Sequence, residues 1–479
     1  MRRAARAAAL IAIASAAGCA PKAQYAPPPV QPAAAFKESE NWKPAQPRDA
    51  DVRGAWWDVF GDPQLTALEA RVDVSNETLR IAEAQFAQAR AVLRAARANR
   101  FPQITAAPAA TSARASANRA VSAFHDPFVD VVAPLDASYE ADVWGRLRGI
   151  VEASRTAAQA TAADLETARL SVHAELAADY FALRGLDREQ QLLEAAVDAY
   201  AQALDLTQNR FRGGLASGAD VAQAETQLET TRAQAVDIGV ERAALEHAIA
   251  LLVGESASTF RLARLPLDAM PPDVPIGVPS ELLERRSDVA AAERRVASAF
   301  AQVGVAEAAY YPIVTLSGAV GFESSSFGSL LSTASAFWTA GPAALVNVLD
   351  FGRRRAAAAQ ARASYDAASA GYRETVLSAF REVEDQLAAL RVLEQEAAIQ
   401  DRAVAAAERS LTLANNRYRG GVASYLEVIT AQSFALANER AAVNLLTRRM
   451  TATVLLVKGL GGNWRAASLP AVAGSSQRD

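Results

Sequence analysis

The chain has few of the residues on which metal sites, redox sites and nucleic-acid-binding surfaces depend. Its 479 residues include one cysteine and three widely separated histidines, and the formal net charge is −4. A single cysteine excludes an intrachain disulfide and a thiolate-rich metal site. The slightly acidic balance excludes a strongly basic nucleic-acid-binding protein. No phosphate-binding loop, nucleophile elbow or zinc-protease motif occurs, so we expect neither an enzyme nor a bound cofactor.

Aromatic residues and long apolar runs are also scarce. Aromatics make up 7% of the chain, and much of its 51% hydrophobic content is alanine, which favours long, closely packed helices. No uninterrupted apolar stretch reaches the length of about 18 residues that a membrane-spanning helix needs. Any membrane crossing by this chain would therefore use something other than a helix.

Residues 1–18 are predicted to be a secretory signal, because a basic segment precedes an apolar stretch too short to span a bilayer permanently. The only cysteine, Cys19, follows Ala-Ala-Gly, which resembles the lipidation site of bacterial lipoproteins, with Ala16 in place of the usual leucine. We expect Cys19 to bear a covalent diacylglycerol and a fatty acyl group such as palmitate; the alternative is an ordinary signal peptide with a cysteine beside its cleavage site. The residue after Cys19 is Ala20 and not aspartate, which in such lipoproteins implies sorting to the outer membrane. Residues 19–62 begin as an extended tether rich in Pro, Ala and Gln.

The body of the chain contains an internal repeat with an offset near 207 residues. Residues 209–217 (NRFRGGLAS) recur as residues 416–424 (NRYRGGVAS), with further matching positions on both sides. Chance similarity between two alanine-rich helices would not reproduce this motif together with its flanking positions. We predict a first structural repeat at 63–278 and a second at 279–460, followed by a tail at 461–479.

Each repeat is predicted to contain a helix, a hairpin of strands, a long helix, a tight turn and a returning helix. At about 1.5 Å per residue, each long helix is on the order of 100 Å in length. Apolar residues spaced alternately by three and four predict a coiled-coil seam, which in the first repeat runs from Leu183 through Tyr200 to Phe211. The predicted elements are first helices at 64–100 and 279–309, hairpins at 101–144 and 311–351, long helices at 145–212 and 352–419, turns at 212–218 and 419–424, and a linker at 253–278.

Apolar and polar residues alternate in both hairpin regions, as in Leu135–Val143 and Val314–Phe322. Alternation over about ten residues is typical of strands in a membrane barrel, although a short soluble hairpin would also show it. Two hairpins provide four strands, which are too few to close a barrel, and open strand edges are not tolerated in lipid. Either the hairpins lie outside a membrane, or several chains combine their strands.

Four separated stretches resemble the TolC-like outer-membrane efflux proteins, in the OprM/NodT-type lipoprotein branch that serves RND pumps. They are Trp56–Gln85, Tyr139–Arg148, Glu284–Ala299 and Phe380–Leu387, and the resemblance covers nearly the whole mature chain. It implies a mainly α-helical homotrimer with a transmembrane β-barrel. Three chains with four strands each would form a 12-stranded barrel, continuous with an α-barrel tunnel of long antiparallel coiled-coil helices. The equatorial segment within 19–62, the linker at 253–278 and the C-terminal tail at 461–479 would form a belt around the tunnel.

The resemblance implies a function as well as a fold. The protein would be a lipid-anchored bacterial outer-membrane channel, the exit duct of a tripartite efflux system with a periplasmic adaptor and an inner-membrane RND transporter. The channel of a type I protein secretion system is an alternative with the same fold. Neighbouring genes for an RND pump and adaptor would favour efflux, and genes for an ABC transporter with adaptor would favour protein secretion. A periplasmic coiled-coil scaffold without a pore is a third hypothesis, which channel conductance would test.

In the resembling family the periplasmic helix ends dock the adaptor and close the channel. The docking residues implied here are those of the two turns, Arg212, Gly213, Gly214, Arg419, Gly420 and Gly421. The glycines are expected to supply the positive φ angles of the turns. The gate links an aspartate after the first turn to a tyrosine and an arginine near the second, and these positions correspond to Asp220, Tyr418 and Ala423. Because Ala423 cannot form an ion pair, we expect Arg417 or Arg419 to supply it.

Acidic residues one helical turn apart line the aperture in that family, and they correspond here to Glu427 and Thr430. Only Glu427 is acidic, so a trimer would have one ring of carboxylates, and crowded carboxylates attract cations. The alternative is that Glu427 is an acid on a solvated helix face. Cation block of the channel conductance, tested in Glu427→Ala, separates these two interpretations.

Overall fold

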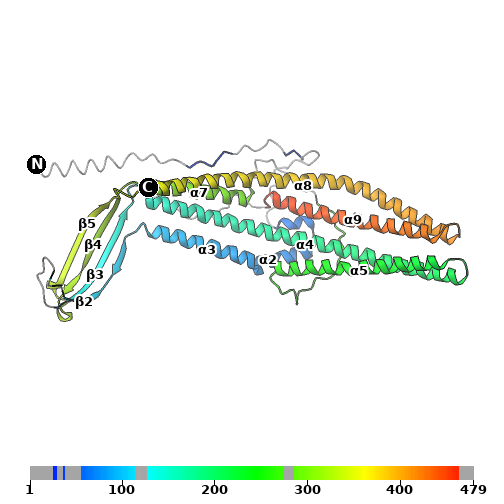
Figure 1. Cartoon of the computed structure of the whole chain (residues 1–479), viewed down its shortest axis with the longest axis horizontal. Coiled ribbons are helices and arrows are strands. Elements are labelled where there is room, and N and C mark those ends of the chain that lie inside the picture. Colours follow the sequence, from blue (N-terminus) through cyan, green and yellow to red (C-terminus); the bar gives the residue numbers. More distant parts are fainter. Residues whose placement is uncertain are drawn as a thin grey trace.

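The computed structural model describes residues 25–29, 36–37, 55–114, 116, 118, 127–272 and 285–462. In this part of the chain, long helices form an elongated body and one antiparallel sheet lies at its end (Figure 1). The helical elements are η2 (Trp56–Phe60), α2 (Pro63–Ser75), α3 (Glu77–Ala98), α4 (Arg146–Arg212), α5 (Gly218–Leu252), α7 (Ser287–Ala308), η3 (Phe327–Ser329), η4 (Thr333–Ser335), α8 (Arg353–Arg419) and α9 (Tyr425–Gly459). The strands are β1 (Gln103–Ala106), β2 (Ala109–Ala113), β3 (Phe128–Ala141), β4 (Ile313–Ser324) and β5 (Ala336–Leu345).

The two longest helices agree with their predicted ranges to within one residue. Both α4 and α8 contain 67 residues, and the sequence offers no proline to interrupt either of them. Helix α4 contacts α3 and α7 in the half nearer the sheet, and α5 and α9 in the other half, where α9 also contacts α8. The α4–α5 and α8–α9 hairpins therefore end together at the tip of the molecule opposite the sheet (Figure 1).

The predicted seam is observed along most of α4. Leu183, Leu193, Tyr200 and other seam residues are buried. Phe211 is an exception and is 50% exposed, so its assignment to the seam is wrong. The reason is local: the Phe211 ring faces Gly218, the first residue of α5, which has no side chain to cover it.

The first predicted helix is broken where the sequence analysis expected it to be continuous. Asn76 has an extended backbone and separates α2 from α3. Its side-chain oxygen accepts a hydrogen bond from the Leu79 N–H (3.0 Å), so it caps α3. Its amide donates to the Leu252 carbonyl at the end of α5 (2.8 Å). The break therefore satisfies free backbone groups at two helix ends, which is the role asparagine commonly has at an N-cap.

The predicted first helix of the second repeat is also interrupted within its range, since Arg285 is helical and Arg286 is not. Arg286 has an extended backbone, and α7 begins at the next residue, Ser287. The Arg286 guanidinium donates to the Gly459 carbonyl (3.0 Å) and to Glu382 (2.8 Å). These bonds fix the chain against the end of α9 and against α8 before α7 starts. Residues 279–284, the predicted start of this helix, lie outside the described part of the chain.

The sheet separates apolar from polar side chains. Strands β1 and β2 pair with successive parts of β3, so the described sheet has four strand positions in the order β1/β2, β3, β4, β5. Leu135, Val320 and Trp338 lie directly opposite one another on three neighbouring strands, and all three are exposed. The next row contains Asp136, Ala319 and Thr339. Because strand side chains alternate between faces, one face is apolar and the other is mostly polar and small.

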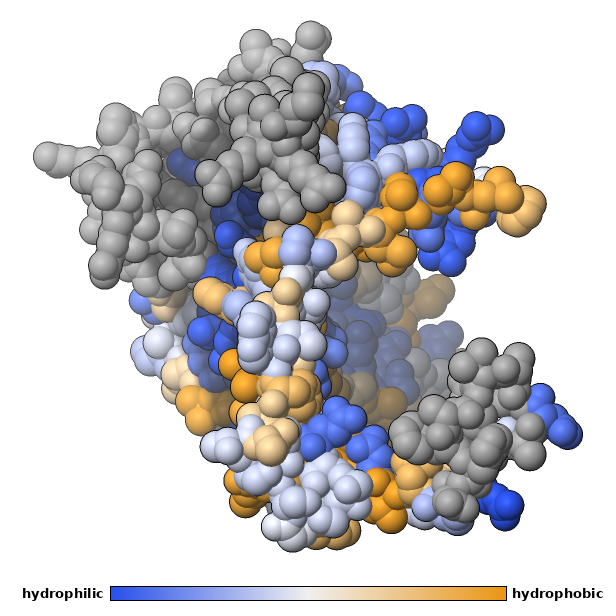
Figure 2. Space-filling view, turned by 90° about the vertical axis from the view of Figure 1, so that its left-hand side faces the viewer, coloured by the Kyte–Doolittle hydropathy of each residue, from blue (hydrophilic) through white to orange (hydrophobic). Residues whose placement is uncertain are grey.

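Figure 2 views the molecule from this end and shows hydrophobic residues at the surface there. The main hydrophobic core lies elsewhere, in the middle of the molecule. It combines Trp56, Tyr180, Phe181 and Met450 with apolar residues of α2, the end of α5 and the segment 260–267. None of the described helices is both long and apolar enough to cross a bilayer.

Candidate functional site

Both helical hairpins end in the same hydrogen-bonded turn. In the first, the Leu215 N–H donates to the Arg210 carbonyl (2.8 Å) and the Gly214 N–H donates to the Phe211 carbonyl (3.0 Å). The same two bonds recur in the second turn, both at 3.0 Å. This pair of bonds is a Schellman motif, which places one residue in the left-handed region. Gly214 has a φ of 71° and Gly421 a φ of 76°, so each second glycine meets that requirement.

The first glycine of each pair does not need this freedom. Gly213 has a φ of −81° and Gly420 a φ of −75°. The prediction that both glycines of each pair supply positive φ is therefore correct only for the second one. The residues that follow are unusual in another way: Leu215 is 74% exposed and Val422 is 73% exposed. Each turn thus presents an apolar side chain to solvent at its apex.

Asp220 caps the start of α5. The Ser217 N–H and hydroxyl both donate to the Asp220 carboxylate (2.8 and 2.9 Å), and the Asp220 N–H donates to the Ser217 hydroxyl (3.2 Å). This reciprocal arrangement is a capping box. Among the contacts of the described residues, none joins Asp220 to Tyr418. Within one chain, the predicted aspartate–tyrosine link is therefore not formed.

Tyr418 is buried at the tip, with 6% of its surface exposed. Its ring packs against that of Tyr425, with centroids 5.3 Å apart. Its hydroxyl lies 3.4 Å from the Thr207 hydroxyl on α4. Burial, followed by the nearby phenols, raises the pKa of Tyr425 to about 12, so its phenol stays protonated at physiological pH. Tyr418 therefore belongs, with Tyr425, to an aromatic cluster that joins α4, α8 and α9.

Arg210 connects the two hairpins, and the sequence analysis did not single it out. From the last turn of α4, its Nη1 donates to the Tyr418 carbonyl (2.9 Å) and, at 3.4 Å, to the Arg419 carbonyl at the end of α8. The guanidinium lies over the Tyr418 ring, 4.6 Å from its centroid. We call Arg210, Tyr418 and Arg419 the tip bridge. The sequence does show that Arg210 is a basic residue in the last turn of a helix, where the helix dipole stabilises a cation. This position does not reveal which other helix the arginine contacts.

Glu427 and Arg417 form an ion pair within the second hairpin. Arg417 Nε lies 3.6 Å from Glu427 Oε2, and both side chains are largely solvent-accessible. This is one of the two arginines expected to compensate for Ala423. The other, Arg419, contributes its carbonyl and not its guanidinium. The Thr430 hydroxyl donates to the Leu426 carbonyl of its own helix (2.8 Å) and is exposed.

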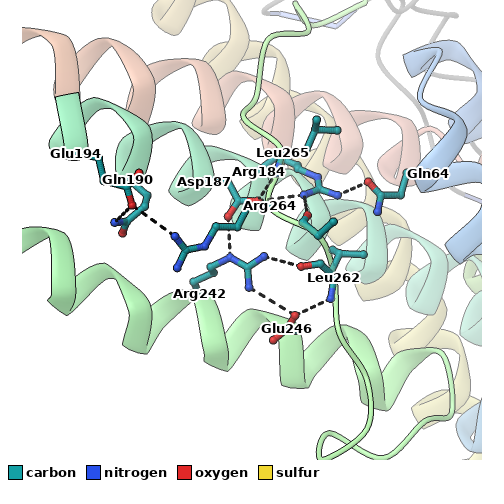
Figure 3. A network of polar contacts seen from close by, with 11 residues as sticks. Gln64, Arg184, Asp187, Gln190, Glu194, Arg242, Glu246, Leu262, Arg264 and Leu265 are labelled. Carbon is teal, nitrogen blue, oxygen red and sulfur yellow. Dashed lines mark hydrogen bonds and ion pairs between the residues drawn. The ribbon is translucent and has the colours of Figure 1, made fainter.

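A second polar cluster, which the sequence analysis missed, lies at mid-length (Figure 3). Arg184 and Asp187 of α4 are nearly inaccessible, with 2% and 4% of their surfaces exposed. Asp187 accepts hydrogen bonds from Arg184 (3.0 Å), from Arg242 of α5 (2.7 Å) and from the Leu265 N–H (3.0 Å). Both arginines also donate to carbonyls of the segment 255–272, and Arg184 further donates to Gln64 of α2. We call Arg184, Asp187 and Arg242 the belt cluster, because it fastens this segment to α4 and α5.

Some predicted sites cannot be placed. Cys19, the predicted signal and the tail beyond residue 462 lie outside the described residues. Within those that are described, no group of three or more His, Cys, Asp or Glu side chains is arranged to hold a metal ion. The remaining predicted tip residue, Arg212, is exposed and its side chain donates to Asn209 of the same helix.

Comparison with known proteins gives a consistent result. The model of the outer membrane efflux protein family matches residues 65–255 and 278–462. The pyoverdine export outer membrane protein OpmQ of Pseudomonas aeruginosa is 29% identical over 423 residues, which are 87% of this chain and 89% of the relative. Outer membrane protein OprJ of the same organism is 30% identical over 446 residues, 92% of each chain. The solved outer-membrane channel OprN superposes with a TM-score of 0.85 at 29% identity, over 91% of this chain and 99% of that one.

Proposed function

This chain belongs to the outer membrane efflux protein family, and on that basis we propose that it is the exit duct of a tripartite efflux system. It is an outer-membrane efflux component, as its relatives are. In this proposal it conducts small molecules passively across the periplasm and the outer membrane. An inner-membrane RND transporter supplies the energy, and a periplasmic adaptor joins transporter and duct. The name of OpmQ, a pyoverdine exporter, favours a small-molecule substrate over a secreted protein.

The two-faced sheet is the observation that supports a duct most directly. An exposed apolar face backed by a polar face suits a wall between lipid and water. The described sheet has open edges at β5 and at β1 with β2, and open edges are unstable in lipid. We therefore propose a homotrimer in which three sheets of four strand positions close a 12-stranded barrel. The α4 and α8 helices, each about 100 Å long, would continue this barrel as a tunnel.

Matching helix lengths support an internal duplication. Both α4 and α8 contain 67 residues, and both α5 and α9 contain 35. The turns between them have the same hydrogen bonds. A duplicated unit at 63–278 and 279–460 would give a trimer six similar hairpins around one tunnel.

The position of Tyr25 supports lipidation at Cys19. The Tyr25 hydroxyl donates to Glu293 of α7 (2.8 Å). From Glu293 to Ala308, at the sheet end of α7, fifteen residues rise about 22 Å. The six residues from Cys19 to Tyr25 can span about 20 Å when extended. An acylated Cys19 can therefore approach the level at which α7 ends, and mass spectrometry of the mature N-terminus tests whether it is acylated.

The helix tips are the proposed site of adaptor docking and of the gate. Exposed apolar side chains at both turn apices, Leu215 and Val422, suit a protein partner. Glu427 lies on the same tip, and a trimer would bring three copies around one axis. We propose that these carboxylates form the cation-attracting ring, with Arg417 as the neighbouring cation in each chain.

Planar-bilayer recording of the purified protein tests the duct. We expect detergent-stable trimers whose conductance is blocked by divalent or trivalent cations, and weaker block in Glu427→Ala. Glu229→Ala is the matched control, because Glu229 is an exposed acid paired with Arg232 on its own helix. Trimers that never conduct would support a scaffold instead of a duct. If the trimers conduct and cations block Glu427→Ala as strongly as wild type, the carboxylate ring is rejected and the duct is not.

A further inference from the structure

Two arginines at equivalent positions of the repeat make different contacts. Arg210 and Arg417 each lie two residues before the Arg-Gly-Gly of their turn. Arg417 pairs with Glu427 inside its own hairpin, at 3.6 Å and in a solvent-accessible position. Arg210 instead reaches the other hairpin through the tip bridge. The arginine at this position is present in both copies of the repeat, but it bridges the two hairpins in only one of them.

The geometry of the tip bridge suits a guanidinium. The Tyr418 and Arg419 carbonyls lie at the C-terminal end of α8, where the helix dipole is negative. The Tyr418 carbonyl also accepts a hydrogen bond from the Gly421 N–H of the turn, so Arg210 is its second donor. One Arg210 nitrogen donates to both carbonyls while the planar group lies over the Tyr418 ring. Arginine can bond and stack at the same time, which an ammonium cannot do equally well.

The bridge is also the outermost of several polar contacts between the hairpins. Farther from the tip, Arg440 of α9 bonds Glu189 of α4 (2.6 Å). Nearer the tip, the Tyr200 hydroxyl of α4 donates to the Gln432 carbonyl of α9 (3.3 Å). Arg210 then joins the last turns of α4 and α8. The Arg210 Nε atom is buried and has no hydrogen-bond partner among the described residues, so one donor of the guanidinium stays unsatisfied.

We propose that Arg210 is a positioning residue of the closed tip. It holds the α8–α9 hairpin against the α4–α5 hairpin, in place of the link that Ala423 cannot make. Loss of the tip bridge frees the two hairpins to separate at the tip and favours the open channel. This inference rests on the proposed duct function and adds the residue that controls the tip.

The test is single-channel recording of the full-length trimer with Arg210→Gln. The bridge combines hydrogen bonds from a cation with a partly exposed cation–π contact, so we expect the open-to-closed ratio to rise about tenfold. Arg210→Lys should lie between wild type and Arg210→Gln, because lysine keeps the charge but loses the flat stacking group. Arg232→Gln is the control, since the ion pair of Arg232 is with Glu229 of its own helix.

A pair of substitutions at Tyr418 distinguishes the bridge from a link through the tyrosine hydroxyl. The bridge uses the ring face and a backbone carbonyl, so Tyr418→Phe should gate like wild type and Tyr418→Leu should open. If Tyr418→Phe opens the channel as fully as Tyr418→Leu, the hydroxyl holds the tip and the proposal is overturned. This pair also decides the matter if Arg210→Gln does not assemble.

The outcomes separate the bridge from the duct. Wild-type trimers that conduct, with Arg210→Gln gating identically, would refute the bridge and leave the duct intact. Trimers of wild type and of every variant that never conduct would refute both. Equal circular dichroism and equal trimer content in wild type and Arg210→Gln show that an altered open-to-closed ratio reflects the tip and not misfolding.

Discussion

Glu69 gives a prediction about how the stability of this protein depends on pH. Its carboxyl lies on α2, fully buried, with Oε2 2.6 Å from Nδ1 of His173 on α4. Its other oxygen has no hydrogen-bond partner. The Trp57 ring stacks on His173 at 4.5 Å, and His173 Nε2 lies 3.3 Å from Asp73. Glu69 and His173 therefore lie between an apolar surface, the Trp57 ring, and a second acid, Asp73.

Burial raises the pKa of Glu69 from 4.5 to about 7, with a further upward effect from Asp73 and an opposing effect from His173. A carboxyl whose pKa is higher in the folded chain keeps its proton while the unfolded chain loses one. The stabilisation is complete below about pH 4.5 and is lost as pH rises through about 7. At about 1.36 kcal/mol per unit of pKa, the loss between pH 5 and pH 8 is roughly 2 to 3 kcal/mol per chain.

Glu69→Gln should remove this dependence, because glutamine imitates the protonated acid at every pH. We expect wild type to lose roughly 2 to 3 kcal/mol more than the variant between about pH 5 and pH 8. Guanidinium unfolding followed by circular dichroism measures the difference. Glu77→Gln, which replaces an exposed acid paired with Arg80, is the control and should follow wild type.

Parallel pH profiles for wild type and Glu69→Gln would refute the reasoning. They would mean that Glu69 is ionised throughout, as one half of a buried ion pair with a protonated His173. In that case Glu69→Gln should also be destabilised at every pH, since it would leave a buried cation unpaired.

Two further predictions concern the turns and the belt cluster. Gly214→Ala should destabilise the protein by about 1 to 2 kcal/mol, because alanine is strained at positive φ, whereas Gly213→Ala should be neutral; thermal unfolding of the two variants checks this. Asp187→Asn should destabilise the protein by about 3 to 5 kcal/mol, because it leaves two buried arginines without their shared carboxylate. Limited proteolysis should then cut the segment 255–272, and Asp268→Asn, which alters an exposed acid, should leave it intact.

The sequence predicted the long helices well because periodicity and the absence of proline are local properties. It predicted the turns for the same reason, since glycine pairs mark them directly. The break at Asn76 had a local signal too, an asparagine followed by Glu77, but the alanine-rich pattern on both sides concealed it. What sequence reasoning could not supply were the partners of isolated polar residues. Arg242, for example, occupies a seam position, which indicates burial, yet its carboxylate partner lies 55 residues away on another helix.

The same limit applies to the candidate site. Motif positions identified Asp220 and Tyr418, but not that the first would cap its own helix. Nothing in the motif distinguishes Arg210 from Arg417, because both copies of the repeat read Asn-Arg-aromatic-Arg. Their different roles depend on which helix happens to face each guanidinium, and that is decided by the packing of the two hairpins.

The placement of the polar contacts also indicates which part of the chain can move. In the belt cluster each charged group is buried and has several partners from different elements, so removing one partner costs several kcal/mol. At the tip, the bridge depends on one partly accessible guanidinium, whose bonds are worth about 1 kcal/mol each. Binding of a partner at Leu215 and Val422 could supply enough free energy to break the tip bridge, but not enough to break the belt cluster. If the tip bridge closes the duct, opening should therefore be confined to the hairpin ends beyond Tyr200, with the middle of the molecule unchanged.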